Sequence, residues 1–187
     1  MHFTLADLVT DITQNGAESG AGLVELCVRE TRDSSGRGEF RFTVTDNGKG
    51  MSPEELKRAQ DPFVTDGVKH PHRKVGLGLP FLIQTAGQSG GGWDIRSKKA
   101  EGTTVSAWFD LGNVDTPPAG DIPGLFRTVL LFNGPGEMLI RRSREAPEGN
   151  IDYEVRKSEL IEALGALEDS QSLILLDKYL RSLETSS

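Results

Sequence analysis

This chain of 187 residues has one cysteine, no excess of positive charge and no long apolar run. The single cysteine, Cys27, cannot form an internal disulfide, which favours a reducing, cytoplasmic setting. The net charge of −7 argues against nucleic acid as a partner, because nucleic-acid-binding proteins are usually basic. No apolar run is long enough to span a bilayer, and the first residues lack the features of a signal peptide. We therefore expect a cytoplasmic protein without a membrane partner.

The spacing of apolar residues in the first 111 residues predicts an α+β fold. Period-3.6 and period-2 patterns predict a helix over 3–19, strands over 23–31 and 39–46, a short helix over 53–60, a helix opened by "VGLGLP", and a hairpin made of "WDIRSK" and "TTVSAWFDL". Cys27 lies inside the first alternating strand, so we expect its side chain to be buried.

The composition changes after this region. The segment "GNVDTPPAGDIPG" is rich in Gly and Pro and predicts a linker or irregular loop. The segment "TVLLFNGPGEMLIRR" predicts a β-hairpin that turns at 133–136, and the last stretch is predicted to be helical. The sequence thus predicts a domain over 1–112 and a C-terminal extension over 113–187. This extension would hold a hairpin and two helices, either separate from the first domain or packed on the same core.

Candidate functional residues lie on the first helix and at the end of the second strand. Asp11 and Asn15 are four residues apart and share a helical face. A carboxamide oxygen suits Mg²⁺, and a nearby carboxylate suits the activation of a water. Asp46 has the parity of the apolar residues in its strand, so its carboxylate points to the buried side and needs hydrogen-bond donors.

Two glycine turns and a threonine complete the pattern. Gly48 and Gly50 follow that strand end in "DNGKG" and let a flat ring approach the backbone. Gly76 and Gly78 open a helix, and free N–H groups at a helix start bind phosphate oxygens. Thr103 begins a strand in "EGTT" with core-facing parity. Each piece alone also fits an ordinary turn, so the specific signal is their order along the chain.

In that order, from about residue 3 to 111, the motifs resemble the GHKL superfamily of Bergerat-fold ATPases. The resemblance implies a two-layer α/β sandwich, with a mostly antiparallel sheet and helices on one face, that binds ATP and Mg²⁺. It implies that Asn15 holds the metal, that Asp46 reads adenine with support from Thr103, and that the glycine turn cradles phosphates. By this resemblance the residues around the nucleotide are Asn15, Asp46, Gly48, Gly50, Lys69, Arg73, Gly76, Leu77, Gly78 and Thr103.

The motifs indicate the superfamily more clearly than the branch of it to which the chain is most similar. The loop "DPFVTDGVKHPHRKVGLGLP" resembles the lid of histidine kinases, in which Lys69 and Arg73 would close over a triphosphate, although a solvated basic loop is the simpler alternative. The segment "DITQNGAESGA" instead resembles the first motif of mismatch-repair ATPases. Asp11 stands where hydrolysing members carry a Glu, and its shorter side chain predicts slow hydrolysis.

Two functions from different classes follow from this resemblance. The first is a stand-alone kinase or slow ATPase that acts on a separate protein partner, because few residues precede the Asn-bearing helix and no phosphoacceptor His lies on a helix there. The alternative is an ATP-responsive regulatory protein that binds a partner without useful catalysis. A mismatch-repair or topoisomerase-like dimerising ATPase is disfavoured, because such enzymes carry a larger second domain.

Overall fold

The computed structural model describes residues 3–61 and 78–185. In chain order its elements are α1 (Leu5–Ala17), β1 (Leu23–Arg32), β2 (Gly38–Asp46), α2 (Pro53–Gln60), α3 (Gly78–Gln88), β3 (Gly92–Lys98), β4 (Gly102–Asp110), α4 (Ile122–Leu130), β5 (Glu137–Glu145), β6 (Ile151–Arg156), α5 (Lys157–Leu164) and α6 (Ser170–Glu184).

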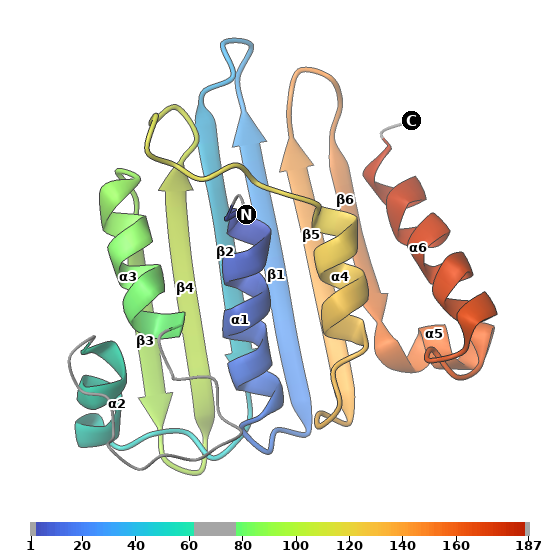
Figure 1. Ribbon diagram of the computed structural model, residues 1–187, viewed down its shortest axis with the longest axis horizontal. Helices are drawn as coiled ribbons and strands as arrows, with labels where there is room; N and C mark the ends of the chain where they lie inside the picture. Colours follow the sequence, from blue (N-terminus) through green and yellow to red (C-terminus); the bar gives the residue numbers. More distant parts are fainter. Residues whose placement is uncertain (1–2, 62–77, 186–187) are drawn as a thin grey trace.

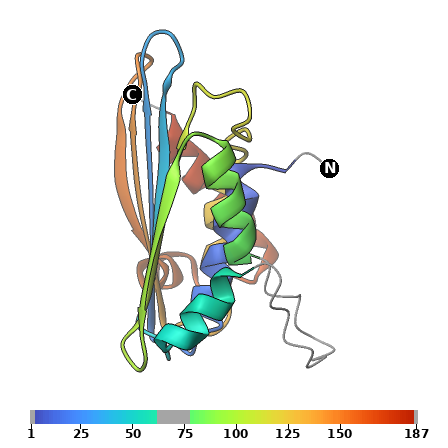
Figure 2. The same cartoon turned by 90° about the vertical axis from the view of Figure 1, so that its left-hand side faces the viewer.

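These elements form two layers. The strands make one six-stranded sheet in the order β3-β4-β2-β1-β5-β6. Among these strands β1 and β5 pair in parallel, and all other neighbours pair antiparallel. Helices α1, α3, α4 and α6 cover one face of the sheet (Figures 1 and 2). The predicted α+β sandwich, with a mostly antiparallel sheet and helices on one face, is therefore confirmed.

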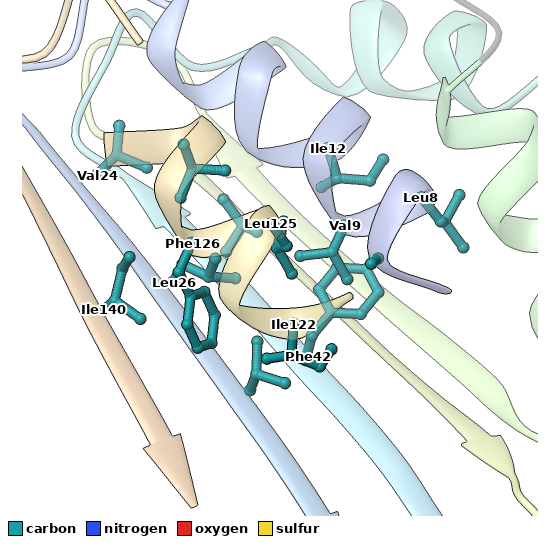
Figure 3. Packing of buried hydrophobic residues seen from close by; sticks show 14 of the residues in the cluster. Leu8, Val9, Ile12, Val24, Leu26, Phe42, Ile122, Leu125, Phe126 and Ile140 are labelled. Carbon is teal, nitrogen blue, oxygen red and sulfur yellow. The ribbon is translucent and has the colours of Figure 1, made fainter. Parts of the chain in front are cut away.

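Helix α1 begins with a capping box at Thr4. The Thr4 hydroxyl accepts a hydrogen bond from the Asp7 backbone N–H, and the Asp7 carboxylate accepts one from the Thr4 backbone N–H. This reciprocal pair satisfies two donors that a helix start leaves free. Leu8, Val9 and Ile12 then recur at helical spacing and pack on the sheet (Figure 3).

Alternation along β1 separates a buried side from an exposed one. Val24, Leu26 and Val28 are fully buried under the helices, whereas Cys27 is exposed. The prediction of a buried Cys27 is wrong, because its parity is opposite to that of the apolar residues. It therefore faces the side of the sheet that the four covering helices leave open, where an antiparallel sheet commonly meets solvent.

The C-terminal part differs from the predicted hairpin. Residues 128–130 complete α4 instead of forming a strand, and the hairpin is β5–β6. The helix forms because Asp121 caps it by accepting from the Gly124 backbone N–H, and Pro123 sits in the first turn. The β-branched and Leu-rich run suggested a strand, but its apolar residues recur at helical spacing from Ile122 onwards and are buried on one face.

No helix within residues 3–61 and 78–185 combines the length and the apolar character that crossing a bilayer requires.

Candidate functional site

The sequence-predicted residues converge at the lower end of the sheet in Figure 1, where β2 ends and β4 begins. Asp46 is the last residue of β2, and its partner in the adjacent strand is Thr103 of β4. Gly16, near the end of α1, packs over this position, because a Cβ placed on it would lie 3.5 Å from the Asp46 Cβ. The structure thus brings the end of the Asn-bearing helix onto the strand end that carries the predicted adenine-reading carboxylate.

Asp46 is buried, with 7% of its surface exposed. Its Oδ1 accepts hydrogen bonds from the Ser19 hydroxyl at 3.0 Å and from the Gly48 backbone N–H at 2.9 Å. No described residue donates to Oδ2. A buried carboxylate is costly unless donors compensate it, so this second oxygen is a place for a donor from solvent or from a ligand.

Ser19 is a site residue that the sequence reasoning missed. Its hydroxyl also lies within hydrogen-bond distance of the Gly16 carbonyl oxygen, at 2.7 Å, and its own carbonyl accepts from the Lys49 backbone N–H. Ser19 therefore ties the end of α1 to the loop after β2. Its sequence signal is weak, because a Ser followed by Gly20 after a helix is typical of an ordinary turn.

Contacts within the protein itself require glycine at both glycine positions of "DNGKG". A Cβ on Gly48 would lie 1.9 Å from the Ser19 Oγ, and one on Gly50 would lie 1.9 Å from the Lys98 carbonyl oxygen. Gly50 also has φ +58°, in the region that favours glycine. These contacts explain both glycines without a ligand, so their role in admitting a ring stays a prediction.

Thr103 reaches the same loop through a second residue that the sequence reasoning missed. Its hydroxyl lies 2.8 Å from the hydroxyl of Ser97 in β3. Ser97 in turn accepts from the Met51 backbone N–H at 2.8 Å and lies 3.1 Å from the Gly102 carbonyl oxygen. The signal was available, because Ser97 shares the parity of the buried Ile95 in the predicted strand.

Asn15 lies beside the start of α3. It is exposed, and a Cβ on Gly78, the first residue of α3, would lie 3.5 Å from the Asn15 Nδ2. The first turn of a helix leaves N–H groups without intrahelical partners. Asp11 is exposed one turn earlier on the same helix. The structure therefore places the predicted metal ligand next to the predicted phosphate-binding helix start.

The remaining predicted residues lie outside the described part of the chain. Residues Lys69, Arg73, Gly76 and Leu77 belong to the stretch 62–77. Their predicted contacts with the nucleotide stay predictions.

A shallow hollow of about 260 Å³ adjoins the strand ends. It is lined by Thr45, Asp46, Arg96, Ser97, Lys98, Glu101, Gly102, Thr103 and Thr104. This lining mixes residues of both parities, so the hollow wraps around the end of the sheet and includes its helix-free side. The hydrogen bonds around Asp46, and not this hollow, define the candidate site.

The chemistry of these groups fits a purine nucleotide with Mg²⁺. Asp46 offers a buried charged acceptor with one oxygen that no described residue engages, which suits an exocyclic amine. Asn15 offers an exposed oxygen ligand beside a helix start, which suits a hard cation bound together with phosphates.

Comparison with known proteins identifies the family. Residues 2–113 match the family described as "Histidine kinase-, DNA gyrase B-, and HSP90-like ATPase". The chain belongs to this family, which is the GHKL superfamily that its motifs resemble.

Several relatives are named as histidine kinases. The NtrY-like protein of Rickettsia conorii is 36% identical over 100 residues, which are 54% of this chain and 15% of that protein. The sensor histidine kinase ZraS of Escherichia coli is 29% identical over 90 residues, 48% of this chain and 18% of its own length. The histidine protein kinase DivJ of Caulobacter vibrioides is 39% identical over 70 residues, which are 37% of this chain and 12% of that protein. This chain thus spans less than a fifth of each of these relatives.

Among solved structures, the ATPase domain of MutL from Aquifex aeolicus, complexed with ADP, is similar to this chain. The match has a TM-score of 0.34 and 14% identity, and covers 75% of this chain and 59% of the MutL chain.

Proposed function

We propose that this chain binds ATP with Mg²⁺ and works as a kinase or slow ATPase module that acts on a separate protein partner. The proposal rests mainly on the burial and the hydrogen bonds of Asp46, which lies within the region that matches the family. Its carboxylate is buried, one oxygen is fixed by Ser19 and Gly48, and no described residue donates to the other. Such a group is an acceptor held ready for a ligand amine.

The other residues take roles that follow from their positions. Asn15 would hold Mg²⁺, and the start of α3 at Gly78 would receive phosphate oxygens. Thr103, linked to Ser97, would support the base beside Asp46. Asp11, on the exposed face of α1, would act as the base for a water. When bound, the nucleotide would supply the phosphoryl group and the metal would neutralise its charge, while the residues named here would position both.

Replacing Asp46 by Asn tests the proposal. The Asn oxygen can still accept from Ser19 and Gly48, so the fold should persist, while the second position changes from an acceptor to a donor. Loss of a charge-assisted hydrogen bond costs about 1.5–3 kcal/mol, so we expect ATP affinity to fall more than about tenfold. Titration calorimetry measures the affinity, and thermal unfolding shows that the variant is folded.

The matched control is Asp94→Asn, which makes the same chemical change at a carboxylate that is half-exposed on β3 and paired with Arg96. It should bind ATP as the wild type does. A folded Asp46→Asn variant with unchanged ATP affinity would rule out the adenine-reading role and leave the proposed function without its main support.

Substitutions at Asp11 distinguish a catalytic function from ATP binding without catalysis. We expect wild-type ATP turnover well below the roughly 1–100 s⁻¹ of kinases acting on their substrates. Asp11→Ala should lower this rate further. Asp11→Glu should raise it, because one more methylene brings the carboxylate nearer a water at the reacting phosphate.

A phosphate-release assay compares these proteins with Asp152→Ala, a change at an exposed carboxylate of β6. Equal rates in all four proteins would favour the alternative function, an ATP-responsive regulatory protein without useful catalysis. That alternative is supported by the resemblance to the superfamily, because Asp11 is a shorter acid than the Glu that hydrolysing members carry there, which tells against efficient hydrolysis.

A further inference from the structure

The C-terminal segment contacts both ends of α1, the helix that carries Asn15. At the first turn of α1, the Leu5 and Ala6 backbone N–H groups donate to the carbonyl oxygens of Pro118 and Ala119, each at 2.9 Å. Donors at a helix start usually find side chains or water. Here the loop before α4 supplies them with backbone acceptors, which fixes where the helix begins.

A glycine of the same loop packs against this end of α1. Gly120 has φ +86°, and a Cβ on it would lie 2.6 Å from the Thr4 Oγ1 and 3.0 Å from the Ala6 Cβ. No side chain fits there without moving the start of α1.

A second glycine packs against the other end. Gly134 lies in the turn between α4 and β5, with φ +124°. A Cβ on it would lie 2.5 Å from the carbonyl oxygen of Ala17, the last residue of α1. Between these two glycines, α4 runs alongside α1 on the same face of the sheet, and its Leu125 belongs to the same core as Val9 (Figures 1 and 3).

We infer that residues 118–136 position α1 and thereby hold the side chain of Asn15 against the start of α3. Asn15 is two residues from Ala17, so a displacement of that end of the helix also moves the carboxamide relative to Gly78. Mg²⁺ demands near-ideal ligand geometry, so small displacements matter for the metal more than for the base. This inference rests on the proposed binding of Mg·ATP, and it makes Gly120 and Gly134 positioning residues.

Gly134→Ala is the main test, with Asn15→Ala as the reference and ATP affinity measured with Mg²⁺ and with EDTA. Asn15→Ala should weaken binding about tenfold with Mg²⁺ and by less than about twofold in EDTA, as loss of one metal ligand predicts. Gly134→Ala should show a split in the same direction but a smaller one, because the added methyl group displaces Ala17 and Asn15 and also shifts Gly16 and Ser19, which contact Asp46. Gly120→Ala should show it more weakly, since it acts at the distant end of the helix.

Two control glycines also have positive φ, but an added Cβ would meet no neighbouring atom at either of them. Gly36 and Gly165 both have φ +79°, and no atom lies within 4 Å of a Cβ on either. Gly36→Ala and Gly165→Ala should leave both affinities within about twofold of the wild type, even where strain lowers the melting temperature. Equal losses with Mg²⁺ and EDTA in folded Gly134→Ala, or the same split in the controls, would overturn the inference.

Hydrogen exchange in the ligand-free protein tests the contacts at the start of α1 independently of nucleotide binding. The Leu5 and Ala6 amides should be protected as strongly as the middle of α1, although helix starts usually exchange fast. Rapid exchange at both amides would show that residues 118–119 do not fix the start of α1. This measurement uses the wild-type protein, so it remains decisive if neither glycine variant folds. Absence of ATP binding by the wild type would instead refute the proposed function, while the exchange data would still report on the contacts of α1.

Discussion

A fragment that ends at Gly112 is expected to lose cooperative unfolding and to aggregate, although every predicted nucleotide-binding residue lies within it. The family match covers residues 2–113, and the sequence favours a boundary at this point. The structure, however, shows strands and helices of the C-terminal segment inside the same sheet and the same core. The fragment therefore tests whether the predicted boundary is a domain boundary.

Strand β5 supplies the first physical reason. It pairs in parallel with β1 from Leu23 to Thr31. Without β5, this long strand would become an edge with unpaired backbone groups, and such an edge is a template for pairing with other chains. The residues Val24, Leu26 and Val28 on its buried face would also lose part of their cover.

Helix α4 supplies the second reason. It buries the five apolar residues Ile122, Leu125, Phe126, Val129 and Leu130 in the core shared with α1 and β1. At about 1.5–3 kcal/mol for each fully buried side chain, the five contribute on the order of 10 kcal/mol. The entropy cost of ordering this segment offsets part of that gain, but the net stability of a typical domain is only about 5–15 kcal/mol, so losing even a fraction of this burial is expected to unfold the fragment.

Circular dichroism during thermal unfolding, with size-exclusion chromatography, measures the effect. The control is co-expression of the fragment with residues 113–187, which should restore a soluble complex because all pairings then reform. A soluble 1–112 fragment that unfolds cooperatively and binds ATP would contradict this prediction and would establish the boundary that the sequence favours.

Local patterns predicted the site-bearing elements well. The alternation of β2 placed Asp46 on the buried side, and Asp46 is indeed buried beside its register partner Thr103. The helices expected over 3–19 and 53–60 are present as α1 and α2. These predictions succeed because strand parity and helical spacing depend on neighbouring residues alone.

Pairings between distant segments were not predictable in this way. The parallel pairing of β1 with β5 joins Leu23 to Glu137, and no local pattern specifies it. The hydrogen bonds of Ser19 and Ser97 likewise depend on how α1 and β3 pack around the loop after β2. A serine has the same local signature in a turn or strand whether or not a buried carboxylate or backbone donor lies opposite.

A buried ion-pair cluster joins the C-terminal helix to the sheet. The Arg142 side chain on β5 is 1% exposed, and its Nη2 donates to the Glu30 carboxylate of β1 at 3.0 Å. Its Nε donates to the Glu184 carboxylate of α6 at 3.0 Å, and the Tyr153 hydroxyl donates to the same carboxylate at 2.7 Å. The cluster therefore connects three strands and the end of α6.

Arg142→Met is expected to destabilise the protein by about 3–5 kcal/mol, because it removes the cation shared by two largely buried carboxylates and leaves Glu30 with Arg32 alone and Glu184 with the Tyr153 hydroxyl. The matched control is Arg29→Met, whose partner Glu145 is exposed, as Arg29 itself is. An exposed pair of this kind contributes at most about 1 kcal/mol. Urea unfolding monitored by circular dichroism gives both values, and the added changes Glu30→Gln and Glu184→Gln should restore part of the loss in the Arg142→Met protein.

The pH dependence of this difference gives a second, independent readout. Burial alone raises the pKa of Glu30, but the hydrogen bonds and charges of Arg32 and Arg142 outweigh it and hold that pKa below its usual value. A carboxyl with a depressed folded-state pKa contributes stability above its unfolded pKa, about 4.3, and loses it as the pH falls through the folded value. The gap in stability between wild type and Arg142→Met should therefore be full above about pH 5 and should narrow in more acidic solution, because protonated Glu30 has no charge to pair. A gap that stays constant or widens on acidification, or a loss no larger than that of Arg29→Met, would show that this cluster does not hold α6 to the sheet by charge.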